Sequence, residues 1–231
     1  MANSSMLELV YASGVAIIIL AAGLFAFSHR GKSDIRYWIA LASGVLISTA
    51  LFEMLPEIGG NFLFVAVGFF SLYLMEKLFM IHACGEYECK IHETSWAAML
   101  STGIDNFIDG MAIATATVAS PFLGLIVTAA VAIHESVQSV TISMMMKKRY
   151  FTPRKILFTL LIFTISIPLG ALLFRTFLAS YFEVMLAFAA GVFLYVGASD
   201  MLPESHKQFN IKVVASVISG ALLIPLLGLL G

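Results

Sequence analysis

The stretch "STGIDNFIDGMAIATATVASPFLGLIVTAAVAIHESVQSV" (residues 101–140) is apolar along most of its length and is interrupted near its middle by Ser120-Pro121. Each half belongs to an apolar block long enough for a helix that crosses the roughly 30 Å hydrocarbon core of a membrane. Both halves nevertheless carry acids, amides or histidine well away from their ends. The stretch therefore predicts two antiparallel membrane helices, joined by a tight turn, with polar groups inside the lipid zone.

The rest of the chain has the same apolar character. It is 60% hydrophobic and only 12% charged, whereas about a quarter of the residues in a soluble domain are charged. The apolar residues form eight long blocks: 6–28, 35–56, 61–81, 95–118, 122–146, 155–175, 181–202 and 211–230. We therefore predict an all-α polytopic membrane protein in which eight transmembrane helices form a single domain over residues 1–231.

The positive charges predict the orientation of these helices. Of the 13 Lys and Arg residues, all but Arg175 fall in or beside the four loops on one side of the membrane. Loops rich in Lys and Arg stay in the cytoplasm, so both termini should lie outside it. The first block starts without a positive charge and is too long for a signal peptide, so we interpret it as a retained helix. A compact chain without a targeting signal fits a prokaryotic plasma membrane.

An internal repeat relates the two ends of the chain. "SGVLISTALFEMLPE" (43–57) resembles "AGVFLYVGASDMLPE" (190–204), and the two copies lie in helices of opposite direction. Inverted repeats are typical of transporters, which bind their substrate near the membrane midplane. We predict a 3+2+3 arrangement: repeat 1 at about 6–81, a central hairpin at about 95–146 and repeat 2 at about 154–230.

Glu53 and Asp200 occupy equivalent positions in this repeat. One interpretation makes them the entry and exit carboxylates of a transport path. The other treats them as ordinary acids at the membrane interface.

The central hairpin gathers side chains of ligand type at one depth. Asp105 lies 15 residues before Ser120 and His134 lies 14 after it, which places both about 20 Å from the turn at about 1.5 Å per residue. Neighbours one turn or one residue away share this level. The candidate ligands are Asp105, Asn106, Asp109, His134, Glu135 and Gln138.

Burial of these acids in a membrane costs free energy, and this cost indicates that they have a function. A carboxylate at the centre of a membrane helix costs about 2.5–3.5 kcal/mol, and neither helix core contains Lys or Arg. The acids must therefore be protonated, share hydrogen bonds or hold a cation. Oxygen ligands with one imidazole suit zinc, iron, manganese or cadmium. The alternatives are hydrogen bonds that only join helices, and a proton or cation channel that uses the acids as a relay.

A second group of metal-ligand types lies in the predicted cytoplasmic segment "IHACGEYECKIHE" (81–93). It contains His82, Cys84, Cys89 and His92. A reducing compartment disfavours a disulfide there, whereas thiolate and imidazole are zinc ligands. The spacing matches no zinc finger, so a metal relay or sensor and an ordinary solvated loop both remain open.

"DNFIDG" and "HESVQS" resemble the paired motifs of the ZIP (Zrt/Irt-like) divalent metal transporters, which typically have H-N-x-P-E-G followed by H-E-x-P-H-E. The resemblance extends to the eight helices, the 3+2+3 repeat and the MLPE sequences. It implies that all six hairpin residues are metal ligands, that the protein is a homodimer and that it takes a divalent ion, zinc foremost, into the cytoplasm. Asp105 and Gln138 depart from the usual ligand types, and Ile108 and Val137 replace the two prolines.

Other functional classes fit the sequence less well. A metalloprotease needs H-E-x-x-H, whereas residues 134–138 read H-E-S-V-Q. The Glu-x-x-His pairs of a di-iron enzyme do not occur at this depth, and the chain has no P-loop. We therefore expect a transporter and not an enzyme, with the metal as substrate, no separate cofactor, the lipid bilayer as its environment and no nucleic-acid partner.

Overall fold

A computed structural model describes residues 6–28, 35–79, 96–205 and 210–229, and within these ranges the chain is helical and contains no β-strand. The α-helices are α1 (Leu7–Ser28), α2 (Arg36–Ser48), α3 (Phe62–Phe79), α4 (Trp96–Ala119), α5 (Pro121–Lys148), α6 (Pro153–Leu173), α7 (Phe182–Tyr195), α8 (Leu202–Ser205) and α9 (Ile211–Gly228). Short π and 3-10 turns extend α2 and α6 and join α7 to α8. Each predicted apolar block is therefore helical, with bounds close to those predicted.

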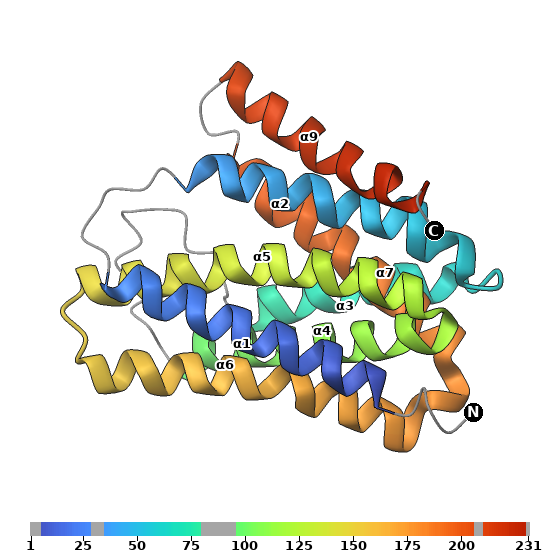
Figure 1. Cartoon of the computed structure of the whole chain (residues 1–231), viewed down its shortest axis with the longest axis horizontal. Helices are drawn as coiled ribbons and strands as arrows, with labels where there is room; N and C mark the ends of the chain where they lie inside the picture. The colour runs from blue at the N-terminus through green and yellow to red at the C-terminus, as the bar shows by residue number, and fades with distance from the viewer. Residues whose placement is uncertain (1–5, 29–34, 80–95, 206–209, 230–231) are drawn as a thin grey trace.

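The outer surface of the bundle is suited to lipid. Large apolar side chains such as Ile17, Phe70 and Leu222 are exposed, and a large exposed apolar surface marks contact with a membrane or with another protein. Five described helical stretches are long and apolar enough to cross a membrane, and one of them, Pro153–Ser205, is 53 residues long and reverses direction between α6 and α7 (Figure 1). The chain is therefore a multi-pass membrane protein.

The helices pack as two groups. In the first group, α1 and α4 each contact both α5 and α6. In the second, α2 packs along α9 and α3 packs along α7. Figure 1 shows α2 and α9 together at one edge of the bundle, with α5, α1 and α6 beneath them. Contacts of α4 with α7 and of α2 with α5 join the two groups.

Close contact between α4 and α6 requires glycine on both helices. A Cβ added at Gly110 would overlap the carbonyl oxygen of Ile167, and one added at Gly170 would overlap that of Phe107. In a membrane, helices gain van der Waals contact when small residues let their backbones approach. Gly110 follows Asp109 directly, so this contact also determines where that acid lies.

α2 and α7, which carry the two copies of the predicted repeat, end in wider turns. Each turn is followed by Leu-Pro-Glu, and a proline has no N–H to bond the carbonyl four residues earlier. Pro56 and Pro203 therefore prevent regular α-helix at these points, and the preceding residues form π turns that carry Glu53 and Asp200. The turns are Thr49–Met54 (η1) and Val196–Met201 (η5).

Candidate metal site

The α4–α5 hairpin that carries the site is closed by a short, well-capped turn. The Ser120 side chain accepts a hydrogen bond from the Leu123 N–H at 3.5 Å, and Pro121 occupies the first turn of α5. Both residues favour a helix start. The two helices are antiparallel neighbours, and both continue without a break through Ile108 and Val137. The family's two prolines are therefore not needed for this local geometry.

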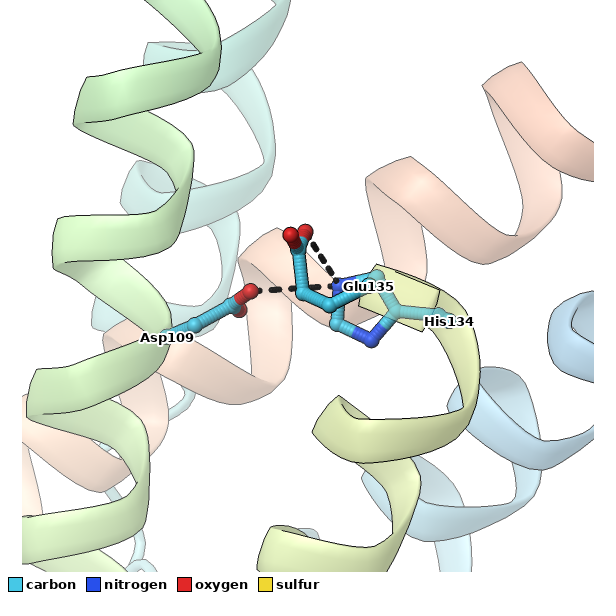
Figure 2. A group of neighbouring side chains, drawn as sticks. All are labelled: Asp109, His134 and Glu135. Atoms are coloured by element: carbon cyan, nitrogen blue, oxygen red, sulfur yellow. Dashed lines mark ion pairs between the residues drawn. The ribbon is translucent and has the colours of Figure 1, made fainter. Parts of the chain in front are cut away.

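Three of the six predicted ligands come together between the helices. His134 Nε2 lies 3.1 Å from Asp109 Oδ2 and 3.3 Å from Glu135 Oε1, as Figure 2 shows. One ligand atom from each residue lies within 4.8 Å of the other two. All three side chains are buried, with exposures of 1–2%. Two carboxylates and one imidazole thus face a common point inside the bundle.

The backbone fixes the orientation of the histidine ring. His134 Nδ1 lies 3.2 Å from the carbonyl oxygen of Ala130. Because a carbonyl can only accept, Nδ1 carries the hydrogen and donates it. Nε2 then faces two carboxylate oxygens, so a proton shared with one of these oxygens or a cation must lie between them. A histidine held through Nδ1 by a backbone carbonyl is the usual arrangement for a metal bound at Nε2.

Three buried side-chain oxygens of the predicted ligands lack a hydrogen-bond donor. Asp109 Oδ2 and Glu135 Oε1 have no hydrogen-bond donor, apart from their contact with the imidazole. Asn106 is fully buried and donates through Nδ2 to the carbonyl oxygen of Phe163 at 3.1 Å, while its Oδ1 has no partner. A buried oxygen without a donor is costly. A cation between the two carboxylate oxygens would remove their share of that cost.

Asp105 and Gln138 lie one turn away from the central group. Both are half-buried, and Asp105 remains under the electrostatic influence of Asp109 and Glu135. Side chains tilt towards the N-terminus of their own helix, so those of α4 tilt away from the Ser120–Pro121 turn and those of α5 tilt towards it. His134 therefore meets Asp109, and not Asp105 at nominally equal depth.

The two repeat-related acids have different surroundings. Asp200, on η5, acts electrostatically on Asp105. Glu53, on η1, lies against the end of α9, because its Oε1 would be 2.7 Å from a Cβ added at Gly228. Asp200 is thus linked to the polar side of the central group, whereas Glu53 lies near the opposite end of the bundle.

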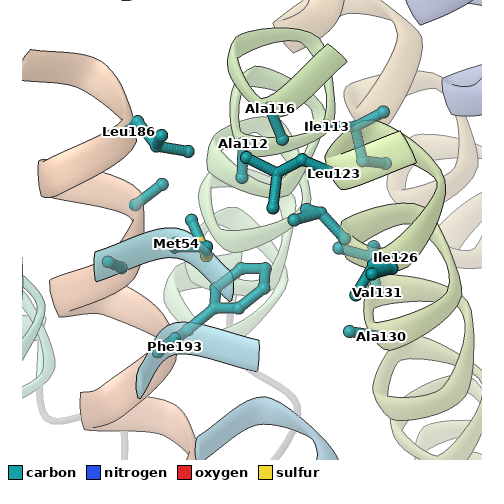
Figure 3. Close-up of a cluster of buried hydrophobic side chains, with 14 of the residues drawn as sticks. Met54, Ala112, Ile113, Ala116, Leu123, Ile126, Ala130, Val131, Leu186 and Phe193 are labelled. Atoms are coloured by element: carbon teal, nitrogen blue, oxygen red, sulfur yellow. The ribbon is translucent and has the colours of Figure 1, made fainter. Parts of the chain in front are cut away.

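A packed apolar cluster fills the space between the site and the Ser120–Pro121 turn. Figure 3 shows side chains from α4 and α5 meeting Met54, Leu186 and Phe193. The members from the hairpin are at most 5% exposed: Ala112, Ile113, Ala116, Leu123, Ile126, Ala130 and Val131. The ring of Phe193 also lies edge-on to His134, with centroids 6.1 Å apart. The described site is therefore sealed on this side.

The roles of the Ala130 carbonyl and of Phe193 have no signature in the sequence, because they depend on contacts between side chain and backbone and between helices. The other predicted metal group, His82, Cys84, Cys89 and His92, lies outside the described residues.

Known proteins contain similar sequences. Residues 81–228 match the family model of the ZIP zinc transporters. The chain is also 30% identical over 115 residues to the proteins named metal cation symporter ZIP14 of Mus musculus, Pongo abelii and Homo sapiens. That alignment covers 49% of this chain and 23% of each relative.

A buried cluster of acids and imidazole inside a multi-pass helical bundle is the arrangement expected of a membrane protein that handles cations. The family match extends over more than half of the chain, and it covers the whole hairpin with its three clustered residues. The chain belongs to the ZIP zinc transporter family. This membership confirms the predicted resemblance and agrees with the expectation of a transporter and not an enzyme.

Proposed function

We propose that the protein carries a divalent transition metal ion, zinc foremost, across the membrane, with Asp109, His134 and Glu135 as its central ligands. The observation that carries this proposal is the His134 ring, whose Nδ1 is held by a backbone carbonyl and whose Nε2 faces two buried carboxylate oxygens. Two carboxylates and a neutral imidazole balance one divalent ion, and nitrogen and oxygen ligands of this kind suit zinc. The name of the ZIP14 relatives, metal cation symporter, supports the same substrate class.

The remaining predicted ligands extend the site in one direction. Asn106 carries a buried amide oxygen without a partner, and Gln138 offers a second neutral oxygen one turn from His134. Asp105 and then Asp200 lead from there, so an ion leaving the centre meets acids on this side and a packed apolar cluster on the other. We propose that this polar side leads to the cytoplasm. Glu53 is then a candidate entry carboxylate near the far end.

The helix arrangement supports a path of this kind. We propose eight crossings: the 53-residue stretch contributes two, the four other long stretches one each, and α3 and α4 complete the count. Under an inverted 3+2+3 repeat, the α2–α9 contact is the counterpart of the α3–α7 contact, and η1 is the counterpart of η5. We further propose that both termini lie outside the cytoplasm and that the protein is a homodimer in a prokaryotic plasma membrane.

Uptake by the purified protein in liposomes tests this function. Zinc, iron, manganese, cadmium and cobalt are offered separately, with and without a pH gradient. We expect saturable uptake, with a loss of more than about tenfold in Asp109→Asn, because a direct ligand matters at least as much as the residues that support ligands. Ser136→Ala is the matched control, since its hydroxyl bonds only to the Ala132 carbonyl of its own helix. Normal uptake by Asp109→Asn would contradict the site.

The same experiment separates a metal carrier from a proton channel. A carrier releases protons when metal displaces them from the site, and its flux saturates with metal. A proton flux that needs no metal would instead support the relay interpretation of the buried acids.

A further inference from the structure

The turn between α5 and α6 is closed by regular hydrogen bonds. α5 ends in a Schellman motif, in which the Phe151 N–H donates to Met146 O and the Tyr150 N–H donates to Lys147 O, both at 3.1 Å. Phe151 then packs against an apolar cluster with Met146 and Ile156. The turn is therefore a well-formed helix end and not an irregular loop.

Tyr150 occupies a position in this motif that normally belongs to glycine. Its φ is 60°, and among the described residues it is the only non-glycine residue with a positive φ. The left-handed conformation is strained for a residue with a Cβ. The side chain is 95% exposed, so packing inside the protein does not offset that strain. A strained residue at a surface points to a contact outside the protein.

Basic residues flank this tyrosine in the sequence. Residues 147–155 contain no acid and five basic residues: Lys147, Lys148, Arg149, Arg154 and Lys155. Basic residues at the end of α5 are favourable, but Arg154 and Lys155 lie in the first turn of α6, where the helix dipole disfavours positive charge. Both are exposed, and Lys155 lies over the Phe151 ring at 5.7 Å.

We propose that the turn 147–155 is a binding site for the anionic headgroups of phospholipids, in which Arg154 and Lys155 bind phosphate and Tyr150 lies in the membrane interface. Orientation of the chain would explain the cations alone, but it leaves the strained tyrosine unexplained. Tyrosine is favoured at the boundary between lipid and water, and basic groups beside a membrane helix attract anionic lipid. The turn joins two membrane helices, so it lies at the level of the headgroups.

Lipid titration of the full-length protein tests the proposal. The protein, in a zwitterionic detergent, is titrated with phosphatidylglycerol or phosphatidylcholine, and bound lipid is counted by native mass spectrometry alongside the unfolding temperature. We expect preferential binding of phosphatidylglycerol. Arg154→Gln with Lys155→Gln should weaken it about 25-fold, because each of the two cations that the proposal places against the lipid phosphate contributes about fivefold. Arg36→Gln with Lys212→Gln, which removes two exposed cations from other helix starts at the same end, should bind like the wild type.

A Tyr150→Gly variant separates lipid binding from folding. Glycine relieves the strain, so we expect an unchanged or higher unfolding temperature without lipid together with weaker phosphatidylglycerol binding. Three results would overturn the proposal: wild-type binding by the Arg154/Lys155 variant, an equal loss in the Arg36/Lys212 control, or an equal thermal shift with inorganic phosphate. The last result would identify a site for free phosphate.

Discussion

The proposed cation site in the α4–α5 hairpin depends on His134, because its two ring nitrogens have different partners. Nδ1 is occupied by the carbonyl of Ala130, so Nε2 is left to face Asp109 and Glu135. Without a proton or a metal at Nε2, a lone pair and two carboxylate oxygens would repel one another in a space closed to water. A proton or a metal ion between these groups is thus part of the stable state of this hairpin.

Metal bound at the proposed site around His134 should stabilise the folded protein. A ligand that binds only the folded protein stabilises it, by about 2.7 kcal/mol at 100 times its dissociation constant. Zinc or cadmium should therefore raise the unfolding temperature of the purified protein, and a chelator should reverse the rise. His134→Ala should fold but show little shift, whereas Ser136→Ala should respond like the wild type. Equal shifts in all three proteins would place the bound ion elsewhere.

The proposed site around His134 should hold one ion and not two. Two divalent ions about 4 Å apart repel by about 16 kcal/mol at an effective dielectric constant of 20, and only bridging carboxylates offset such repulsion. Here the central group has two acids, the nearby Asn106 and Gln138 are neutral, and the neighbouring position on α6 is the fully buried Ile167. We expect one well-occupied site. Crystals soaked in cadmium would contradict this if they showed two fully occupied peaks within about 5 Å of each other.

At the scale of the element, the contact between α4 and α6 places Asp109. Gly110→Ala would push a methyl group into the Ile167 carbonyl oxygen. Overpacking of this kind costs about 1–3 kcal/mol or more, and backbone movement would displace the adjacent acid. We therefore expect a lower unfolding temperature and reduced metal uptake.

Gly103 provides the matched control for this prediction. It lies on the same helix and faces α6, but an added Cβ would lie 3.7 Å from Ile162 and Ser166, which is ordinary contact. Gly103→Ala should be neutral or stabilising, by up to about 1 kcal/mol, because alanine favours helix. If both variants behaved alike, close approach at Gly110 would not be what positions the acid.

The positions of the helices follow from the sequence more directly than the contacts between them. Helix positions and the hairpin could be predicted, because apolar block length and the Ser120-Pro121 break are local signals. The choice of Asp109 over Asp105 as the partner of His134 could not, because it depends on opposed side-chain tilt across two helices. The π turns before Pro56 and Pro203 also went unpredicted, since the proline marks an interruption without specifying its form.

At the scale of the molecule, the site is asymmetric along the helix direction. The side towards the Ser120–Pro121 turn is packed with apolar residues, whereas Asp105 and Asp200 lie on the other side. An ion bound at the proposed site would therefore meet acids in one direction and packed apolar side chains in the other. The ends of α1 and α9 nearest the termini lie together at one end of the bundle (Figure 1), so the orientation of the termini also determines which compartment the polar side faces.

The last prediction tests this orientation. Both native cysteines, Cys84 and Cys89, are first replaced by serine, and single cysteines are then introduced at two highly exposed positions at opposite ends of the bundle. Tyr150 is 95% exposed and Leu229 is 82% exposed. Because positive loops remain in the cytoplasm, a membrane-impermeant thiol reagent should label Tyr150→Cys only from the cytoplasmic side and Leu229→Cys only from outside. Labelling of both from one side would contradict the three proposed crossings, α6, α7 and α9, that lie between the two positions. Reversal of both would keep the fold but direct the polar side away from the cytoplasm, so the proposed direction of transport would then be wrong.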